Sequence, residues 1–353
     1  MKNPTLIISV LLSSILIISA CKNDNNPEPE PPEKIYQSSL INPSFEELQT
    51  FYELGYNVIN GNVEFDNIDG LLNMLTLSNV TSIKGFFLII NNNDLITFEG
   101  LNNLKTIGGR LEISNSVNLI NINDLNKLES VGEGLSILSN TNLEHLEGLN
   151  NLQSVAGSLN VSFNSTLQTI ESLIHLQSIA GDLTIDGNNF LSSLVGLNNL
   201  DSVSNLTISH NEALISLEGL NNLNSISGDF YLQQNDNIVS LEGLGNLKSI
   251  GGMFLILRNP ITNLNGLNNL ISTASFYIGS QYYGNHSLTS LEGLNSLQTV
   301  AGYFKIRYNS NLSDLCGIKD LLIQNGVNLE SVSIQYNAYN PSVEDIINGD
   351  CSL

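Results

Sequence analysis

The chain has 353 residues, 41% of them hydrophobic, so it can bury a large core and is not a disordered protein. Only 13% of the residues are charged, and 34 acidic against 12 basic side chains give a formal net charge of −22. A nucleic-acid-binding protein needs a basic surface, and this composition excludes one. With few charges and 28 glycines, the composition is typical of a chain with many tight turns.

The first residues have the layout of a secretory signal. Lys2 forms a positive n-region, residues 5–19 are apolar, and two small residues precede Cys21. The apolar stretch is shorter than the ~20 residues that a membrane-spanning helix needs. The sequence Ile-Ser-Ala-Cys at 18–21 resembles the lipobox of bacterial lipoproteins. That resemblance implies cleavage before Cys21 and acylation of this cysteine, which would attach the protein to a membrane.

We therefore assign residues 1–20 to a signal peptide and 21–40 to the acylated cysteine and a tether. Four of the eight prolines lie in residues 22–34, where they alternate with glutamates and favour an extended polyproline II chain. Lys22 is not the aspartate associated with retention in the inner membrane, so we expect an outer-membrane lipoprotein of the bacterial envelope. Residues 23–25 resemble surface-export signals of some Bacteroidetes lipoproteins, and both the periplasmic and the surface-facing orientation stay open.

One segment of about 24 residues recurs through the rest of the chain. Residues 108–131 align with residues 156–179 and again with residues 180–203. The apolar position before the glycine step recurs at intervals of 24, with one interval of 23, at Ile59, Ile83, Ile107, Val131, Val155, Ile179, Val203, Ile226, Ile250 and Val300. Between Ile250 and Val300, one coil has Thr273 at the apolar position and then carries extra residues. An irregular coil follows at 329–337.

Each repeat combines two hydrophobic periods. A Leu-x-Ile pair alternates with period two and predicts a short strand with both apolar residues inward. Apolar residues then recur at every third position with glycines among them, which predicts tight bends rather than a helix. A single repeat cannot bury its own apolar face, so the repeats must stack. We predict a mainly β fold, a right-handed parallel β-helix-like solenoid of about 11–12 coils over residues 58–315.

Two polar positions of the repeat are also periodic. An asparagine follows the strand at Asn92, Asn140, Asn164, Asn188, Asn211, Asn235, Asn259, Asn309 and Asn337, with Ser116 and Gln281 in its place in two coils. We expect these amides to point inward, to satisfy backbone groups and to stack as a ladder. A glycine precedes the strand at Gly61, Gly85, Gly109, Gly157, Gly181, Gly228, Gly252 and Gly302. We expect it to supply a backbone angle that a side chain would forbid.

The segment before the first repeat predicts an N-terminal cap helix within residues 41–57. Ser44 and Glu47 form a capping box, and Phe45, Leu48 and Phe51/Tyr52 recur at helical spacing.

The sequence FEELQTFYELGYNVINGNVEF at 45–65 resembles the opening of a receptor L domain, the solenoid of insulin-receptor-type ectodomains. The body, residues 41–337, also resembles repeat lipoproteins of Bacteroidetes. A leucine-rich-repeat horseshoe is the alternative, because L-x-I-x-x-N-x-x-L is similar to its motif. We prefer the L-domain-like β-helix because the repeat lacks a clean helical segment. The ligand contacts of the receptors are not part of the motif, so the resemblance implies no ligand residues here.

Beyond Cys21, the chain has two more cysteines, Cys316 and Cys351. An even number of cysteines in an oxidising compartment predicts a disulfide. Because the repeat breaks down between them, we assign residues 316–353 to the last coil and a C-terminal cap closed by this bridge.

The sequence contains no recognisable catalytic motif. His145, His175, His210 and His286 occupy different positions of the repeat without metal-ligand spacing. Glutamates share one position, at Glu99, Glu147, Glu171, Glu218, Glu242 and Glu292. Because each coil offers one carboxylate, we interpret them as a solvated acidic edge rather than a Ca²⁺ site. We therefore expect a protein without enzymatic activity, cofactor or metal.

The outward residue of the Leu-x-Ile strand changes character along the chain. Early coils carry mostly small or acidic residues there, at Glu64, Leu88, Glu112, Ser136, Asn160, Thr184 and Thr207. Later coils carry tyrosine and basic residues, which are enriched in interfaces. We predict a binding patch of Tyr231, Leu255, Leu257, Arg258, Tyr277, Tyr282, Tyr283, Lys305, Arg307 and Tyr308. The equal alternative is a ladder of side chains that only stabilises the sheet.

The expected function is non-enzymatic binding or adhesion by a lipid-anchored, monomeric envelope protein with an extracellular protein or glycan ligand. A purely structural scaffold is the alternative, followed by a β-helix enzyme that acts on polysaccharides.

Overall fold

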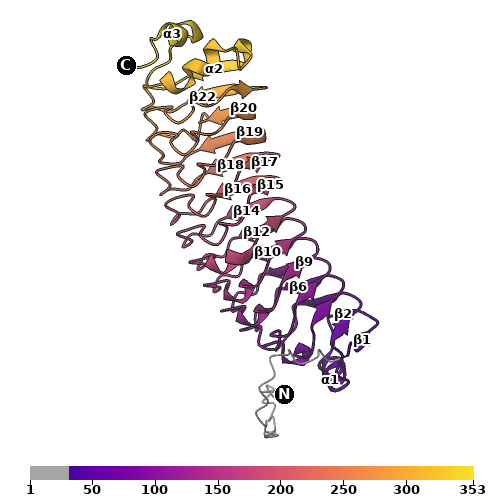
Figure 1. Cartoon of the computed structure of the whole chain (residues 1–353). Coiled ribbons are helices and arrows are strands. Elements are labelled where there is room, and N and C mark those ends of the chain that lie inside the picture. Colours follow the sequence, from indigo (N-terminus) through magenta and orange to yellow (C-terminus); the bar gives the residue numbers. More distant parts are fainter. Residues whose placement is uncertain (1–31) are drawn as a thin grey trace, which may run out of the picture. The chain divides into compact units, whose positions relative to one another are not determined.

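The repeats form coils whose strands pair in parallel, one coil upon the next (Figure 1). The computed structural model describes residues 32–353, so the predicted signal peptide, Cys21 and most of the predicted tether lie outside the described residues. The first strands, β1 and β2, lie at residues 35–41 and pair with β3 and β4. The solenoid therefore begins before residue 58, inside the segment assigned from sequence to the tether and cap.

Two rows of strands run along the coils. The narrow sheet consists of β1 (Ile35–Tyr36), β3 (Val58–Ile59), β5 (Ser82–Ile83), β7 (Thr106–Ile107), β9 (Ser130–Val131), β11 (Ser154–Val155) and β13 (Ser178–Ile179). The wide sheet runs through β2 (Leu40–Ile41), β4 (Val63–Asp66), β6 (Phe87–Ile90), β8 (Leu111–Ser114), β10 (Leu135–Leu138), β12 (Leu159–Ser162), β14 (Leu183–Asp186), β16 (Leu206–Ser209), β18 (Phe230–Gln233), β19 (Ser249–Leu257), β20 (Ser272–Ile278), β22 (Phe304–Arg307) and β23 (Val332–Gln335). The short strands β15 (Ser202–Val203), β17 (Ser225–Ile226) and β21 (Thr299–Val300) belong to the wide sheet as well. The predicted parallel β-solenoid is confirmed.

The Leu-x-Ile strands build the core as predicted. In β12, Leu159 and Val161 are buried, while Asn160 between them points to the other face and is partly exposed. Leu159 pairs with Leu135 of the preceding coil and with Leu183 of the next, so the 24-residue period becomes residue-for-residue register. Toward the C-terminus phenylalanines take the first inward position and their rings contact one another, stacked or edge to face, with centroids 4.7 to 5.4 Å apart, at Phe230, Phe254, Phe276 and Phe304.

The stretches with an apolar residue at every third position form successive tight turns. In one coil the backbone N–H of Leu149 donates to the carbonyl of Leu146, and that of Leu152 to Leu149. Three residues per turn place these leucines on one side, facing the core. Some turns lengthen to 3₁₀ helices, at η1 (Leu75–Leu77), η2 (Asn123–Leu125), η3 (Glu147–Leu149), η4 (Glu171–His175), η5 (Cys316–Ile318) and η6 (Leu329–Ser331).

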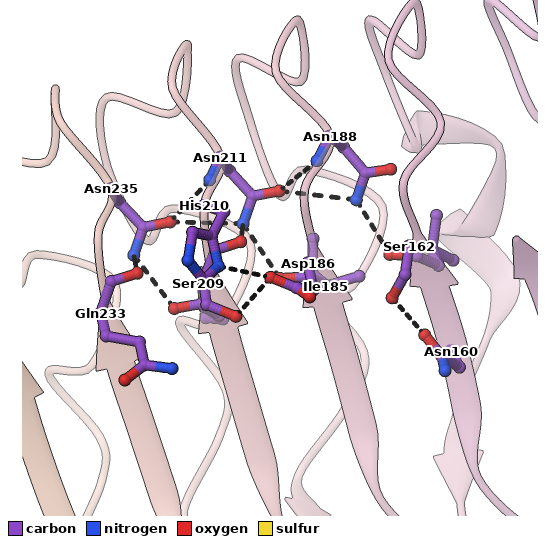
Figure 2. A network of polar contacts seen from close by, with 12 residues as sticks. Asn160, Ser162, Ile185, Asp186, Asn188, Ser209, His210, Asn211, Gln233 and Asn235 are labelled. Atoms are coloured by element: carbon purple, nitrogen blue, oxygen red, sulfur yellow. Dashed lines mark hydrogen bonds and ion pairs between the residues drawn. The ribbon is translucent and has the colours of Figure 1, made fainter. Parts of the chain in front are cut away.

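The predicted asparagine ladder is present and buried (Figure 2). The side-chain oxygen of Asn211 accepts from the backbone N–H of Asn188 at 3.1 Å. Its amide nitrogen donates to the carbonyls of Ile185 and Ser209, both at 2.9 Å. The backbone N–H of Asn211 donates in turn to the side chain of Asn235. Each amide thus satisfies backbone groups at the bend where the sheet ladder stops.

One member of this ladder was predicted wrongly. Gln281 is exposed, and Asn285 takes the buried position, where its side-chain oxygen accepts from the N–H of Asn259 at 3.0 Å. The extra residues of this coil form an outward turn before the chain rejoins the repeat, which shifts the asparagine along the sequence. At the end of the ladder, Asn340 accepts from the N–H of Asn337 at 2.9 Å.

The role predicted for the glycines before the strands is also wrong. None of these glycines has a positive φ. They leave room instead: a Cβ on Gly85 would lie 2.0 Å from the side-chain oxygen of Asn62, and one on Gly252 would lie 2.1 Å from that of Asp229. Asn62 and Asp229 accept backbone N–H groups of the next coil, so the glycine accommodates a second line of side-chain acceptors.

Both ends of the solenoid are closed. Helix α1 (Phe45–Glu53) begins with the predicted capping box, and it buries Leu48 and Phe51 but leaves Phe45 exposed. Helices α2 (Lys319–Ile323) and α3 (Val343–Asn348) lie at the C-terminal end (Figure 1). Within residues 32–353 no helix is both long and apolar enough to cross a membrane.

The predicted disulfide is confirmed. Cys316 and Cys351 are bonded, with their Cα atoms 5.0 Å apart. Next to the bridge, the N–H of Leu315 donates to the carbonyl of Cys351 at 2.8 Å. The chain end is therefore fixed to the last regular coil both covalently and by the backbone.

Candidate binding surface

The predicted patch lies on the outer face of the last strands of the wide sheet. Register pairs Tyr231 with Leu255, Leu255 with Tyr277, and Tyr277 with Lys305, so these four form one row across β18, β19, β20 and β22. All four are partly exposed. The next outward positions, at Leu257, Arg258, Arg307 and Tyr308, form neighbouring rows. We call this surface, together with Tyr303 and Tyr336, the C-terminal face.

Two cations of the C-terminal face contact neutral groups. The Lys305 ammonium lies 4.3 Å from the ring centroid of Tyr303 and 5.0 Å from that of Tyr277. Arg307 donates from Nε and Nη2 to the hydroxyl of Ser333, at 2.9 and 2.6 Å. Among the described residues neither cation pairs with a carboxylate. Their charges therefore remain available to a ligand.

Tyr231 at the start of the row is bound within the protein. Its hydroxyl donates to the Asp229 carboxylate at 2.6 Å. This hydrogen bond, followed by partial burial, raises the pKa of Tyr231 to about 12. The partly exposed Tyr231 therefore has its hydroxyl already occupied within the protein.

The outward turn formed by the extra residues before Asn285 lies beside the end of β22, where a Cβ on its Gly279 would lie 2.0 Å from the carbonyl oxygen of Arg307. Tyr282 is 80% exposed and Tyr283 is 42% exposed, so the turn projects both rings into solvent. Its Gly284 packs closely on the next coil, because a Cβ there would lie 1.8 Å from the carbonyl oxygen of Tyr308. A hollow of about 200 Å³ lies next to the turn and is lined by Asp236, Arg258, Asn259, Pro260, Gly284, His286 and Ser287.

Sequence reasoning missed two tyrosines of this face. Tyr303 directly precedes β22 and is 56% exposed. Tyr336 follows β23, is 63% exposed, and stacks on Tyr308 with ring centroids 4.5 Å apart and planes inclined by 11°. Tyr336 occupies the same repeat position as Arg258 and Tyr308, whereas Tyr303 lies one residue before the strand, where no residue was selected. Extending the alignment by one residue before and two after Leu-x-Ile would have found them.

The residue after each Leu-x-Ile strand has left-handed backbone geometry. Early coils use Asn67, Asn91 and Asn115 there, the residue type that tolerates this region best after glycine. Middle coils carry other residues at this position, at Ser139, Phe163, His210 and Gln234. The C-terminal face uses Arg258, Tyr308 and Tyr336 at the same place, with φ of 51°, 60° and 62°. The left-handed conformation costs an ordinary residue about 1–2 kcal/mol. These three side chains thus occupy positions that the backbone would give to asparagine.

Asp186, Ser209 and His210 form a polar cluster, separate from the C-terminal face, on the outer face of β14 and β16 (Figure 2). One carboxylate oxygen of Asp186 accepts from the Ser209 hydroxyl at 2.6 Å and from Nδ1 of His210 at 2.8 Å. In a serine hydrolase triad the imidazole stands between the acid and the hydroxyl and activates the latter. Here the carboxylate stands between them, so the cluster does not generate a nucleophile.

Two further charged contacts join residues close in sequence: Arg110 lies 4.0 Å from Glu112, and His145 lies 3.7 Å from Glu144. The six glutamates that share one repeat position are all exposed on the turns, where they form a solvated row. Within residues 32–353, no three His, Cys, Asp or Glu side chains come together as a metal site. The four histidines lie in different coils, as their spacing predicts.

No family model and no curated protein matches the sequence of this chain.

Proposed function

We propose that the protein is a lipid-anchored envelope protein that uses its solenoid for non-enzymatic binding of an extracellular protein or glycan. The C-terminal face supports this proposal, because aromatic rings and unpaired cations gather there on an otherwise acidic chain. Tyrosine and arginine are the residue types that contribute most to binding energy at interfaces. The likeness of residues 45–65 to a receptor L domain is part of the same proposal.

The proposed binding role is tested by removing three outward side chains at once. The variant Tyr231→Ser, Tyr277→Ser, Arg307→Ser should fold, because all three lie on the outer face of the sheet. We expect its affinity for a ligand found on protein and glycan arrays to fall at least tenfold. The matched control is Ser136→Ala with Thr184→Ser on the outer face of β10 and β14, which should bind like the wild type. A folded triple variant with unchanged binding would contradict the proposal.

A structural scaffold is the second candidate. Arg307 bonds to Ser333 in the next coil, and Lys305 lies over Tyr277 in the preceding one, so these side chains also tie coils together. A scaffold role predicts that the triple variant is destabilised and that no ligand binds the wild type in a saturable way. Thermal denaturation and array binding of the same samples therefore distinguish a scaffold from a binding protein.

The lipid anchor is tested separately at Cys21, which lies outside the described residues. Cys21→Ser should yield soluble or uncleaved protein, because the acceptor of the acyl chains is lost and stable anchoring generally takes more than one chain. Membrane fractionation followed by mass spectrometry of the product measures this. A variant of mature size that still fractionates with membranes would refute the anchor.

A further inference from the structure

We infer that the C-terminal face binds an acidic polysaccharide, a polymer of sugar rings that carry carboxylate or sulfate groups. This inference rests on the proposed binding function and narrows it to one ligand class. The residues that would carry it are Tyr303, Lys305, Arg307, Tyr308 and Tyr336.

Charge on the outer face of the wide sheet is separated along the solenoid. The outward positions from β4 to β18 include one cation, Arg110, which lies 4.0 Å from the Glu112 carboxylate, and the acidic residues Glu64, Asp66, Glu112, Asp182, Asp186 and Asp229. The corresponding positions in and beside β19, β20, β22 and β23 include Arg258, Lys305 and Arg307 and no acidic residue. An anionic polymer is repelled by the rest of this acidic chain and attracted to its C-terminal end.

The tyrosines supply exposed aromatic surface and hydroxyl groups that a sugar chain can contact. The rings of Tyr308 and Tyr336 come from successive coils and stack on each other, and Tyr303, with the Lys305 ammonium over its ring, lies before the same strand. Coils of a parallel sheet repeat every ~4.8 Å, close to the length of one sugar residue in an extended chain. Successive rings and cations can therefore contact successive sugars.

The shape of the face favours a polymer on its surface over a peptide or a small molecule. The backbone of β20 and β22 is paired on both sides, so an extended peptide cannot add to the sheet there as a further strand. The adjacent hollow of about 200 Å³ is smaller than the ~300 Å³ at which pockets for small molecules begin.

Backbone geometry provides a replacement that removes these rings without straining the fold. Tyr308 and Tyr336 have left-handed backbone geometry, which asparagine adopts more easily. The same repeat position carries asparagine at Asn67 and Asn91 and an aromatic residue outside the face at Phe163. Asparagine at 308 and 336 should therefore fit the backbone, and Phe163 offers a matched position outside the face.

The test measures binding of the full-length protein, in detergent, to four polymers. These are polygalacturonate, dextran sulfate, fully methyl-esterified polygalacturonate, which has the rings without the charge, and poly-L-glutamate, which has the charge without the rings. We expect saturable binding to one or both acidic polysaccharides, weakened as salt rises from about 50 to about 500 mM. The protein should bind methyl-esterified polygalacturonate and poly-L-glutamate at least tenfold more weakly.

Variants assign the binding to this face. Tyr308→Asn with Tyr336→Asn should lower affinity about tenfold while the melting temperature stays the same or rises, because asparagine relieves the left-handed strain. Lys305→Gln should lower affinity and flatten its salt dependence. The matched control is Phe163→Asn, which also replaces an aromatic residue with asparagine at this repeat position but lies outside the face. It should leave affinity unchanged.

Several outcomes would overturn the inference. Unchanged affinity in a folded double variant excludes this face, and an unfolded double variant shows that the rings serve the fold. Equal binding of poly-L-glutamate shows that charge alone decides. A protein ligand on the arrays, with no binding to any polysaccharide, overturns the ligand class but keeps the proposed function. No saturable ligand of any kind overturns both.

Discussion

Replacing Asn211 with alanine should lower the free energy of unfolding by about 3–4 kcal/mol, because it leaves several buried backbone groups without partners and each costs about 1–3 kcal/mol. The side chain accepts from Asn188 and donates to the carbonyls of Ile185 and Ser209, with no exposed surface (Figure 2). Asn211→Asp should cost at least as much, since it keeps the shape but exchanges the donor for a buried charge.

Chemical denaturation measures the overall loss, and hydrogen exchange locates it at the coils on either side. The matched control is Asn222→Ala. This asparagine also reaches across to the preceding coil, donating to the carbonyl of Asn198 at 2.6 Å, but it is exposed. Water replaces its bond, so the change should cost less than about 1 kcal/mol. Equal losses at the two positions would show that burial of the ladder contributes nothing.

Removing the disulfide should destabilise the C-terminal cap by roughly 4 kcal/mol. The bridge joins residues 35 apart and closes a loop of that size in the unfolded chain. In a solenoid each coil contacts only its neighbours, so the loss stays near the end where the bond lies. Cys316→Ser with Cys351→Ser should therefore speed hydrogen exchange and proteolysis in residues 316–353.

The coils from β4 to β14 serve as the internal control, because exchange there should match the oxidised wild type. Mass spectrometry of unreduced peptides should first show Cys316 and Cys351 linked in the purified protein. If the double variant exchanges in its cap at the wild-type rate, the bridge does not stabilise the cap.

Much of the fold follows from the sequence because the repeat is also the structural register. The strand positions, the turns with three residues per step and the buried asparagines, such as Asn211, all follow from chain spacing. Where spacing changes, the prediction fails. The extra residues before Asn285 moved the ladder position, and Gln281 was selected in its place.

Contacts between coils were less predictable than the coils themselves. The glycine before the strand was expected to adopt a special φ, whereas it makes room for an acceptor of the neighbouring coil, as Gly252 does for Asp229. Such a requirement depends on two residues 23 apart, so neither shows it alone. The left-handed geometry of Tyr308 and Tyr336 was not predicted for a different reason, because bulky side chains rarely adopt it.

Because β10, β12 and β14 pair residue for residue, the gene of such a chain can gain or lose a whole repeat. Removing residues 156–179 would join Val155 directly to Ala180, and Ala180-Gly181 would follow as Ala156-Gly157 does now. Unequal recombination between neighbouring repeats of the gene can therefore delete or duplicate one whole coil while every remaining side chain keeps its kind of neighbour. The length of the molecule is therefore free to vary in steps of one repeat while both end caps stay the same.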